Sequence, residues 1–114
     1  MTSDAGVVLR RDLLLTQPYV APRNAAERKL SDIRCNVLSM DRVGVDDNYN
    51  DLGGDSLAAI MMFTLIRQAF GIEVPVATLI NAPTIAELAS EIERRQASKA
   101  EQHAGETAAP EPRR

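Results

Sequence analysis

The feature that most constrains the fold is the stretch 57–70, in which most residues are apolar and Arg67 is the only charged one. Its apolar positions recur at i, i+3, i+4 and i+7, which is the spacing of one face of an α-helix. Further apolar side chains lie beside that stripe. A helix this apolar is either buried on all sides or in contact with a partner. In a chain of 114 residues both outcomes stay open.

A short turn, Gly53-Gly54-Asp55-Ser56, stands directly before this apolar stretch. Two glycines favour a tight loop, and Asp and Ser are both common helix N-caps. The second helix is therefore expected to start at Asp55 or Ser56 and to end at Phe70. The hydroxyl of Ser56 then lies at a helix N-terminus, where free N–H groups and the helix dipole favour an anion. Ser56 can carry a phosphate ester, cap the helix or act as a nucleophile.

Further helices are predicted on either side of this segment. A capping box at Asn24 predicts a first helix over 25–39, and a second capping box at Thr84 predicts a last helix over 84–95. One helical turn is expected over 76–80. A long polar loop joins the first two helices. The sequence thus predicts an all-α fold, a four-helix bundle of three main helices and one short helix.

This helical core is predicted to form one domain over 24–95 with a flank on each side. Residues 1–23 contain two prolines and no clear period, so we expect a mostly extended leader or linker that behaves as a flexible tail. The alternative is that Leu13-Leu14-Leu15 docks on the domain. Residues 96–114 are rich in Ala, Glu, Pro, Lys and Arg and are expected to form a disordered tail.

Composition excludes several classes of protein. A net charge of −3 argues against nucleic-acid binding, which needs a basic face. The single cysteine, Cys35, excludes an internal disulfide and fits a reducing cytoplasm. No run approaches the roughly 20 apolar residues that span a membrane. We therefore expect a cytoplasmic protein that contacts neither nucleic acid nor membrane.

The inventory of reactive side chains argues against an enzyme. The only histidine, His103, falls in the predicted tail, and no histidine lies beside Cys35. Zinc ligands and the spacing of a calcium loop are both absent, so we expect no catalytic residue and no metal site. A hydrolase that uses Ser56 is disfavoured because no base is near it in the sequence. The inventory favours modification of Ser56 over catalysis by it.

The motif Leu52-Gly53-Gly54-Asp55-Ser56-Leu57 resembles the attachment motif of peptidyl carrier proteins, the thiolation domains of nonribosomal peptide synthetases. The resemblance covers about residues 19–95 and includes the entry linker (19–24), the first loop (43–48), the end of the second helix (70–75) and the start of the last helix (82–85). It implies an acyl-carrier-like four-helix bundle of the phosphopantetheine-binding superfamily. We expect a free-standing form.

In this family the serine at the position of Ser56 receives 4′-phosphopantetheine from coenzyme A, and the flanking motif residues are Gly54, Asp55 and Leu57. A phosphopantetheinyl transferase makes that bond with Mg²⁺ in its own site. The terminal thiol then carries an aminoacyl or acyl group as a thioester. The resemblance implies a monomeric carrier, not an enzyme, that serves an adenylating enzyme acting in trans and a downstream condensation or tailoring enzyme.

The second helix and the adjoining loop usually form the docking face of such carriers. Ile60, Met61, Leu65 and Ile80 are the candidate docking residues here. Met61 and Leu65 fall at positions that are often basic in the family, so we expect an apolar docking patch. The sequence also allows these side chains to pack within the bundle.

Some residues depart from the family pattern. Asp55 stands where histidine is frequent, Asn50 where a second aromatic residue is common, and Arg34 where tryptophan is common. The segment 6–13 resembles the last segment of an adenylation domain, but Val7 holds the place of the catalytic lysine. This indicates a carrier descended from a larger synthetase.

Two alternatives stay open. An acyl carrier of polyketide or fatty-acid type usually has acidic residues on the second helix, and none lies in 57–70. The other alternative is an unmodified helical interaction module, in which Ser56 only caps its helix.

Overall fold

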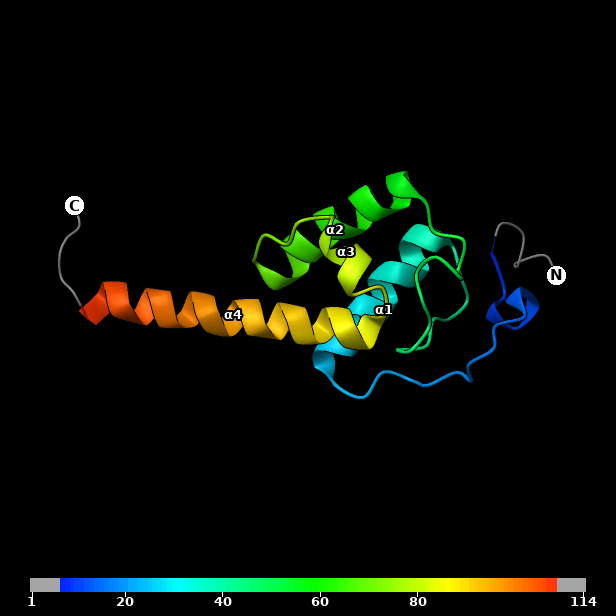
Figure 1. Ribbon diagram of the computed structural model, residues 1–114, viewed down its shortest axis with the longest axis horizontal. Coiled ribbons are helices and arrows are strands. Elements are labelled where there is room, and N and C mark those ends of the chain that lie inside the picture. Colours follow the sequence, from blue (N-terminus) through cyan, green and yellow to red (C-terminus); the bar gives the residue numbers. More distant parts are fainter. Residues whose placement is uncertain (1–6, 109–114) are drawn as a thin grey trace.

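The computed structural model describes residues 7–108, with side chains up to residue 100. Within that range a short 3₁₀ helix precedes four α-helices: η2 (Arg10–Leu13), α1 (Ala25–Leu38), α2 (Ser56–Phe70), α3 (Thr78–Asn81) and α4 (Ile85–Ala108). The only β-type pairing in this range is an isolated bridge between Val8 and Met40. The predicted all-α bundle of three main helices and one short helix is confirmed (Figure 1).

The capping residues expected from the sequence start two of these helices. The side chain of Asn24 accepts a hydrogen bond of 2.8 Å from the backbone N–H of Glu27 at the start of α1. At the start of α4, Thr84 Oγ1 accepts from the N–H of Glu87 and the carboxylate of Glu87 accepts from the N–H of Thr84, both at 3.2 Å. These bonds satisfy backbone donors that a helix end leaves without partners.

The core joins the three long helices to the loop between α1 and α2. α1 packs against both α2 and α4. The apolar stripe predicted on α2 is buried as expected, and it consists of Ala59, Met62, Phe63 and Ile66. The loop contributes further buried apolar side chains, those of Met40, Val43, Val45, Tyr49 and Leu52. The loop that leads to Ser56 is therefore part of the core and not a loose connection.

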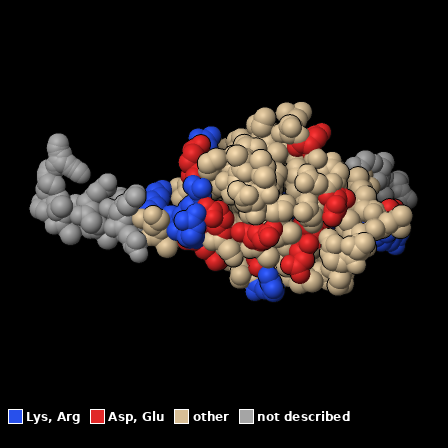
Figure 2. All heavy atoms as spheres, viewed as in Figure 1, with Lys and Arg blue, Asp and Glu red and all other residues tan. Residues whose placement is uncertain are grey.

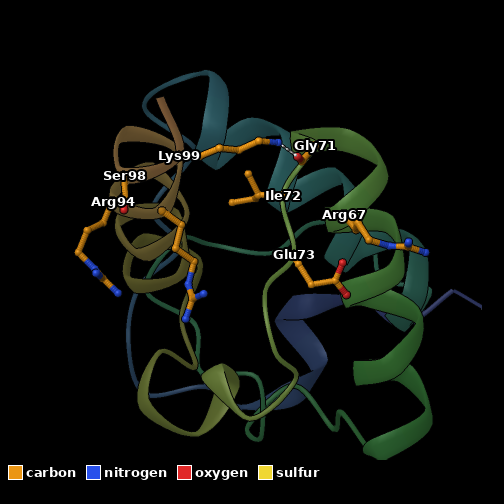
Figure 3. Close-up of a pocket in the computed structure, with 8 residues that line it drawn as sticks. Arg67, Gly71, Ile72, Glu73, Arg94, Ser98 and Lys99 are labelled. Carbon is orange, nitrogen blue, oxygen red and sulfur yellow. Dashed lines mark hydrogen bonds between the residues drawn. The ribbon is translucent and has the colours of Figure 1, made fainter. Parts of the chain in front are cut away.

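The C-terminal flank differs from the expected disordered tail. α4 does not end near residue 95 but continues to Ala108, and it projects beyond the bundle (Figure 1). Lys99 Nζ donates a hydrogen bond of 2.7 Å to the carbonyl of Gly71, beside a hollow of about 640 Å³ (Figure 3). Gln96 donates to the carbonyl of Phe70 at 3.3 Å. Carbonyls at a helix C-terminus lack intrahelical donors. The side chains of Gln96 and Lys99 supply such donors to the end of α2, and these contacts stabilise α4 beyond residue 95.

The N-terminal flank also differs from the expected flexible leader. The N–H of Val8 donates to the carbonyl of Ser39 at 2.7 Å, and the N–H of Asp41 donates to the carbonyl of Val8 at 3.0 Å. Leu13 and Leu15 pack against the core, as the docking alternative expected, whereas Leu14 is 89% exposed. Residues 1–6, which include the first residue of the segment compared with adenylation domains, lie outside the described residues. The leader from residue 7 onward is thus packed on the domain.

None of the helices in the described part of the chain is long and apolar enough to cross a membrane. The same residues contain no group of three or more side chains placed to hold a metal ion.

Candidate functional site

The turn before α2 is built around the ring of Tyr49. Only 3% of Tyr49 is exposed, and its hydroxyl donates a hydrogen bond of 2.7 Å to the carbonyl of Asp55. A Cβ atom on Gly54 would overlap this ring and would lie 2.6 Å from its Cε1 atom. Gly53 has φ of 83°, which favours glycine for a different reason, since the space around it is open. Gly53 is thus favoured by its backbone conformation, and Gly54 by the close approach of the Tyr49 ring.

Asp55 is the residue that caps α2. Its backbone is extended, and its Oδ1 atom accepts a hydrogen bond of 2.9 Å from the N–H of Ala58. Ser56 is the first residue of the helix itself, and it is exposed. Of the three roles open to Ser56, helix capping is therefore taken by its neighbour. The serine hydroxyl is accessible to another molecule.

The electrostatic setting of Ser56 suits a phosphate ester. The N-terminus of α2 presents backbone N–H groups and the positive end of the helix dipole, and its first turn holds no acidic residue. Tyr49 does not supply a base, because burial raises the pKa of its hydroxyl and the nearby charge of Asp55 raises it further. The phenol therefore stays protonated and serves as a hydrogen-bond donor.

A groove opens beside Ser56, between the start of α2 and the short helix α3. Its volume is about 610 Å³, and its surface is more apolar than polar. The lining side chains come from the turn, α2 and the α3 region: Tyr49, Asn50, Gly54, Asp55, Ser56, Ala59, Ile60, Val76, Ala77, Leu79 and Ile80. A flexible chain attached to Ser56 therefore has an apolar path to follow.

The structure separates the four candidate docking residues. Ile60 and Ile80 line the groove and are 54% and 81% exposed, whereas Met61 is exposed on α2 outside the groove. Leu65 is half-buried. Sequence reasoning missed Val76, an exposed apolar residue in the groove that precedes α3. The surface over α2 and α3 is mostly uncharged, while acidic residues gather below it (Figure 2).

Arg34, at the position where the family often has tryptophan, lies beneath the turn. It is fully buried; its Nη1 donates to the carbonyl of Pro83 at 2.9 Å, and its guanidinium lies 5.4 Å from the centre of the Tyr49 ring. Its Nε and Nη2 atoms have no hydrogen-bond partner among the described residues. Burial lowers the pKa of Arg34 to about 10. Arg34 supports Tyr49 by packing, at the cost of two unsatisfied donors.

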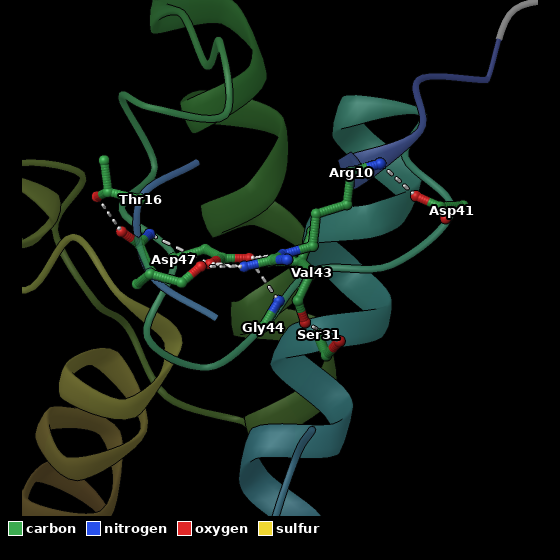
Figure 4. Close-up of polar contacts among 8 residues, drawn as sticks. Arg10, Thr16, Ser31, Asp41, Val43, Gly44 and Asp47 are labelled. Carbon is green, nitrogen blue, oxygen red and sulfur yellow. Dashed lines mark hydrogen bonds and ion pairs between the residues drawn. The ribbon is translucent and has the colours of Figure 1, made fainter. Parts of the chain in front are cut away.

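Neither Cys35 nor Asp47 is among the residues that line the groove. Cys35 is half-buried, and burial raises the pKa of its thiol, which keeps it in the less reactive protonated form. His103 lies beyond the side chains that the structure describes. Asp47, in the acidic loop, is held in an ion pair with Arg10 (Figure 4).

Comparison with known proteins agrees with this geometry. Residues 28–92 match the family described as "Phosphopantetheine attachment site". The chain belongs to this family of carrier domains. A dimodular nonribosomal peptide synthase of Bacillus subtilis (strain 168) is 44% identical over 72 residues, which are 63% of this chain and 3% of that protein. The carrier thus corresponds to a small part of such a synthase.

Solved structures show the same fold. A peptidyl carrier protein in complex with the phosphopantetheine transferase Sfp and coenzyme A is 36% identical, with a TM-score of 0.64; the match covers 67% of this chain and 99% of that one. A non-covalent extended docking domain complex of the Pax NRPS is 30% identical, with a TM-score of 0.71, over 86% of this chain and 96% of that one. The expected family, fold and phosphopantetheine cofactor are confirmed.

Proposed function

We propose that Ser56 is the residue that carries 4′-phosphopantetheine, received from coenzyme A through a phosphopantetheinyl transferase. The observation that supports this most is at the start of α2, where Asp55 caps the helix and the exposed hydroxyl of Ser56 is not needed for capping. The serine oxygen would form a phosphodiester with the arm, and adenosine 3′,5′-bisphosphate would leave.

The residues around Ser56 fit the arm. A phosphate on Ser56 would lie near the first-turn N–H groups of α2; the carboxylate of Asp55 occupies only the N–H of Ala58, and the first turn itself holds no acidic residue. Gly54 lets the backbone pass the ring of Tyr49, which in turn holds the carbonyl of Asp55. The apolar groove can shelter the arm. When bound, the arm supplies a thiol that holds an acyl or aminoacyl group as a thioester.

In this proposal the carrier makes no bond itself but delivers its cargo between enzymes of nonribosomal peptide biosynthesis. Adenylating and downstream enzymes would dock on the exposed apolar surface next to the groove, at Leu57, Ile60, Met61 and Ile80. Half-buried Leu65 would support this surface from within α2. Exposed apolar side chains grouped beside a functional residue are characteristic of an interaction site. Met61→Glu should slow loading by the adenylating enzyme, while Ser90→Glu, which adds the same charge at an exposed position on α4 outside the groove, should load as the wild type does.

A second candidate role concerns the extension of α4. The helix projects beyond the bundle (Figure 1), and the match to the Pax docking domain complex covers 86% of this chain, against 67% for the peptidyl carrier protein of the Sfp complex. We propose that the extension helps to recruit a downstream enzyme. A chain that ends at Arg95 should accept phosphopantetheine at the normal rate but pass its cargo on more slowly. Equal transfer rates would remove this role.

The attachment proposal is tested by incubating the purified chain with coenzyme A, Mg²⁺ and a broad-specificity transferase and then measuring the intact mass. The wild type should gain the mass of one phosphopantetheine group. Ser56→Ala should gain nothing, and Ser90→Ala, which removes an exposed hydroxyl on α4, should behave as the wild type. No gain in the wild type would instead favour an unmodified interaction module.

A further inference from the structure

The leader is joined to the domain by a buried ion pair. Arg10 is 9% exposed and Asp47 is fully buried. Arg10 Nε donates to Asp47 Oδ2 at 2.6 Å and Nη2 donates to Oδ1 at 2.7 Å, so the pair is bidentate (Figure 4). Charge-assisted bidentate pairs restrict geometry more than single hydrogen bonds do. The two residues are 37 positions apart in the sequence, so the contact connects the leader to the loop between α1 and α2.

Asp47 is also the centre of a wider network. Its carboxylate accepts from the N–H of Gly44 at 2.8 Å and from Gln17 Nε2 at 3.2 Å. Arg10 Nη2 donates to the carbonyl of Gln17 at 3.1 Å. Burial by itself would raise the pKa of Asp47, but the hydrogen bonds from Arg10, Gly44 and Gln17 outweigh it and lower the pKa. Asp47 is therefore charged and well satisfied at neutral pH.

Other contacts attach the leader along the same loop. Two guanidinium groups contact the ring of Tyr19, that of Arg10 at 5.4 Å and that of Arg42 at 4.2 Å from its centre. The N–H of Val45 donates to the carbonyl of Val20 at 2.9 Å. A simple linker would need none of these contacts. They hold the first half of the loop in place from the leader side.

The second half of the loop connects the part held by the leader to the turn before Ser56. Tyr49 follows Asp47 by two residues, its N–H donates to the carbonyl of Pro83 at 3.0 Å, and its hydroxyl donates to the carbonyl of Asp55. Asp55 caps the helix on which Ser56 is the first residue. The Arg10–Asp47 pair and the Tyr49–Asp55 hydrogen bond are thus separated by only two residues of backbone, which links the leader to the turn that presents Ser56.

We propose that Arg10 and Asp47 are a positioning pair for loading of the carrier: the leader holds the loop, and through it the Tyr49–Asp55 turn, in the conformation that a phosphopantetheinyl transferase accepts. This inference rests on the proposed attachment at Ser56. The leader segment 8–20 is then a working part of the carrier domain, although it precedes the residues that match the family.

The test compares full-length Arg10→Ala with Arg11→Ala, which removes the adjacent arginine in an exposed position. Loading by a transferase is followed with the carrier as the varied substrate, and hydrogen exchange is measured for the amides of residues 44–55. Arg10→Ala should raise the KM about fivefold or more, the equivalent of losing about 1 kcal/mol of recognition. It should also speed exchange across 44–55. Arg11→Ala should change neither, and Arg10→Lys, which keeps the charge but loses the bidentate bond, should fall between them.

The readouts separate the possible failures. Wild-type KM and wild-type exchange in Arg10→Ala would overturn the positioning role. Faster exchange without any change in KM or kcat would also overturn it, because the pair would then serve stability alone. If Arg10→Ala does not fold, Gln17→Ala, which removes one outer contact to Asp47, takes its place with smaller effects of the same sign expected. Loading of Ser56→Ala would instead refute the attachment site.

Discussion

The substitution Gly54→Ala tests how the turn is built. A methyl group at this position would overlap the ring of Tyr49, which is only 3% exposed, so the ring cannot keep its present position. Tyr49 must then shift and lose its 2.7 Å hydrogen bond to Asp55, or the backbone of the turn must move. Either response displaces the residue directly before Ser56.

The expected cost combines two terms. Overpacking of a buried site costs about 1–3 kcal/mol, and loss of the hydrogen bond adds about 1 kcal/mol. We expect the free energy of unfolding to fall by about 2–4 kcal/mol. In a domain of this size each kcal/mol lowers the Tm by about 4–8 °C. The Tm should therefore fall by at least about 8 °C.

Gly53→Ala is the matched control. The space around Gly53 is open, so only its φ of 83° opposes a side chain, at a cost of about 1–2 kcal/mol. Urea unfolding gives both free energies, and loading with coenzyme A reports on the site. Gly54→Ala should be the less stable variant and load more slowly than Gly53→Ala. Equal stability and equal loading rates in the two variants would refute the role given to the Tyr49 ring.

Three further predictions concern buried charge and the contact between α4 and the end of α2. Arg34→Met should leave the free energy of unfolding unchanged or raise it by about 1–3 kcal/mol, because it removes a buried cation with two unsatisfied donors; a loss above about 2 kcal/mol in urea unfolding would contradict this. The folded-state pKa of Asp47 lies below its unfolded value of about 3.9, so its contribution to stability is complete at neutral pH and is lost as the pH falls below about 4. The difference in unfolding free energy between pH 7 and pH 3 should accordingly be smaller in Asp47→Asn than in the wild type. Lys99→Ala should lower the free energy of unfolding by less than about 1 kcal/mol, because its hydrogen bond to the carbonyl of Gly71 is exposed. A larger loss in urea unfolding would contradict this.

Local signals in the sequence were sufficient to predict most of the bundle. Asn24 and Thr84 each have a glutamate three residues later, and both act as caps. The apolar stripe on α2 predicted its buried face, and the family motif predicted where Ser56 lies. What the motif left open was whether Ser56 or Asp55 caps α2, because both residue types serve well at that position.

In the described residues both flanks are more ordered than the favoured sequence prediction, for a common physical reason. From the sequence alone, Arg10 is expected on the surface, because its partner Asp47 lies 37 residues away and no local pattern connects the two. The extension of α4 has no apolar period, but Gln96 and Lys99 contact the end of α2. Long-range polar contacts thus hold part of each flank, and neither hydrophobic periodicity nor local capping predicts such contacts.

The most direct test of the attachment at Ser56 is to locate the modification on the loaded wild-type chain. Cleavage with trypsin after Arg42 and Arg67 releases the fragment 43–67, in which Ser56 is the only serine. Tandem mass spectrometry of this fragment should place one phosphopantetheine group on Ser56. A loaded chain in which fragment 43–67 is unmodified, or carries the group on Tyr49 or Thr64, would contradict the account.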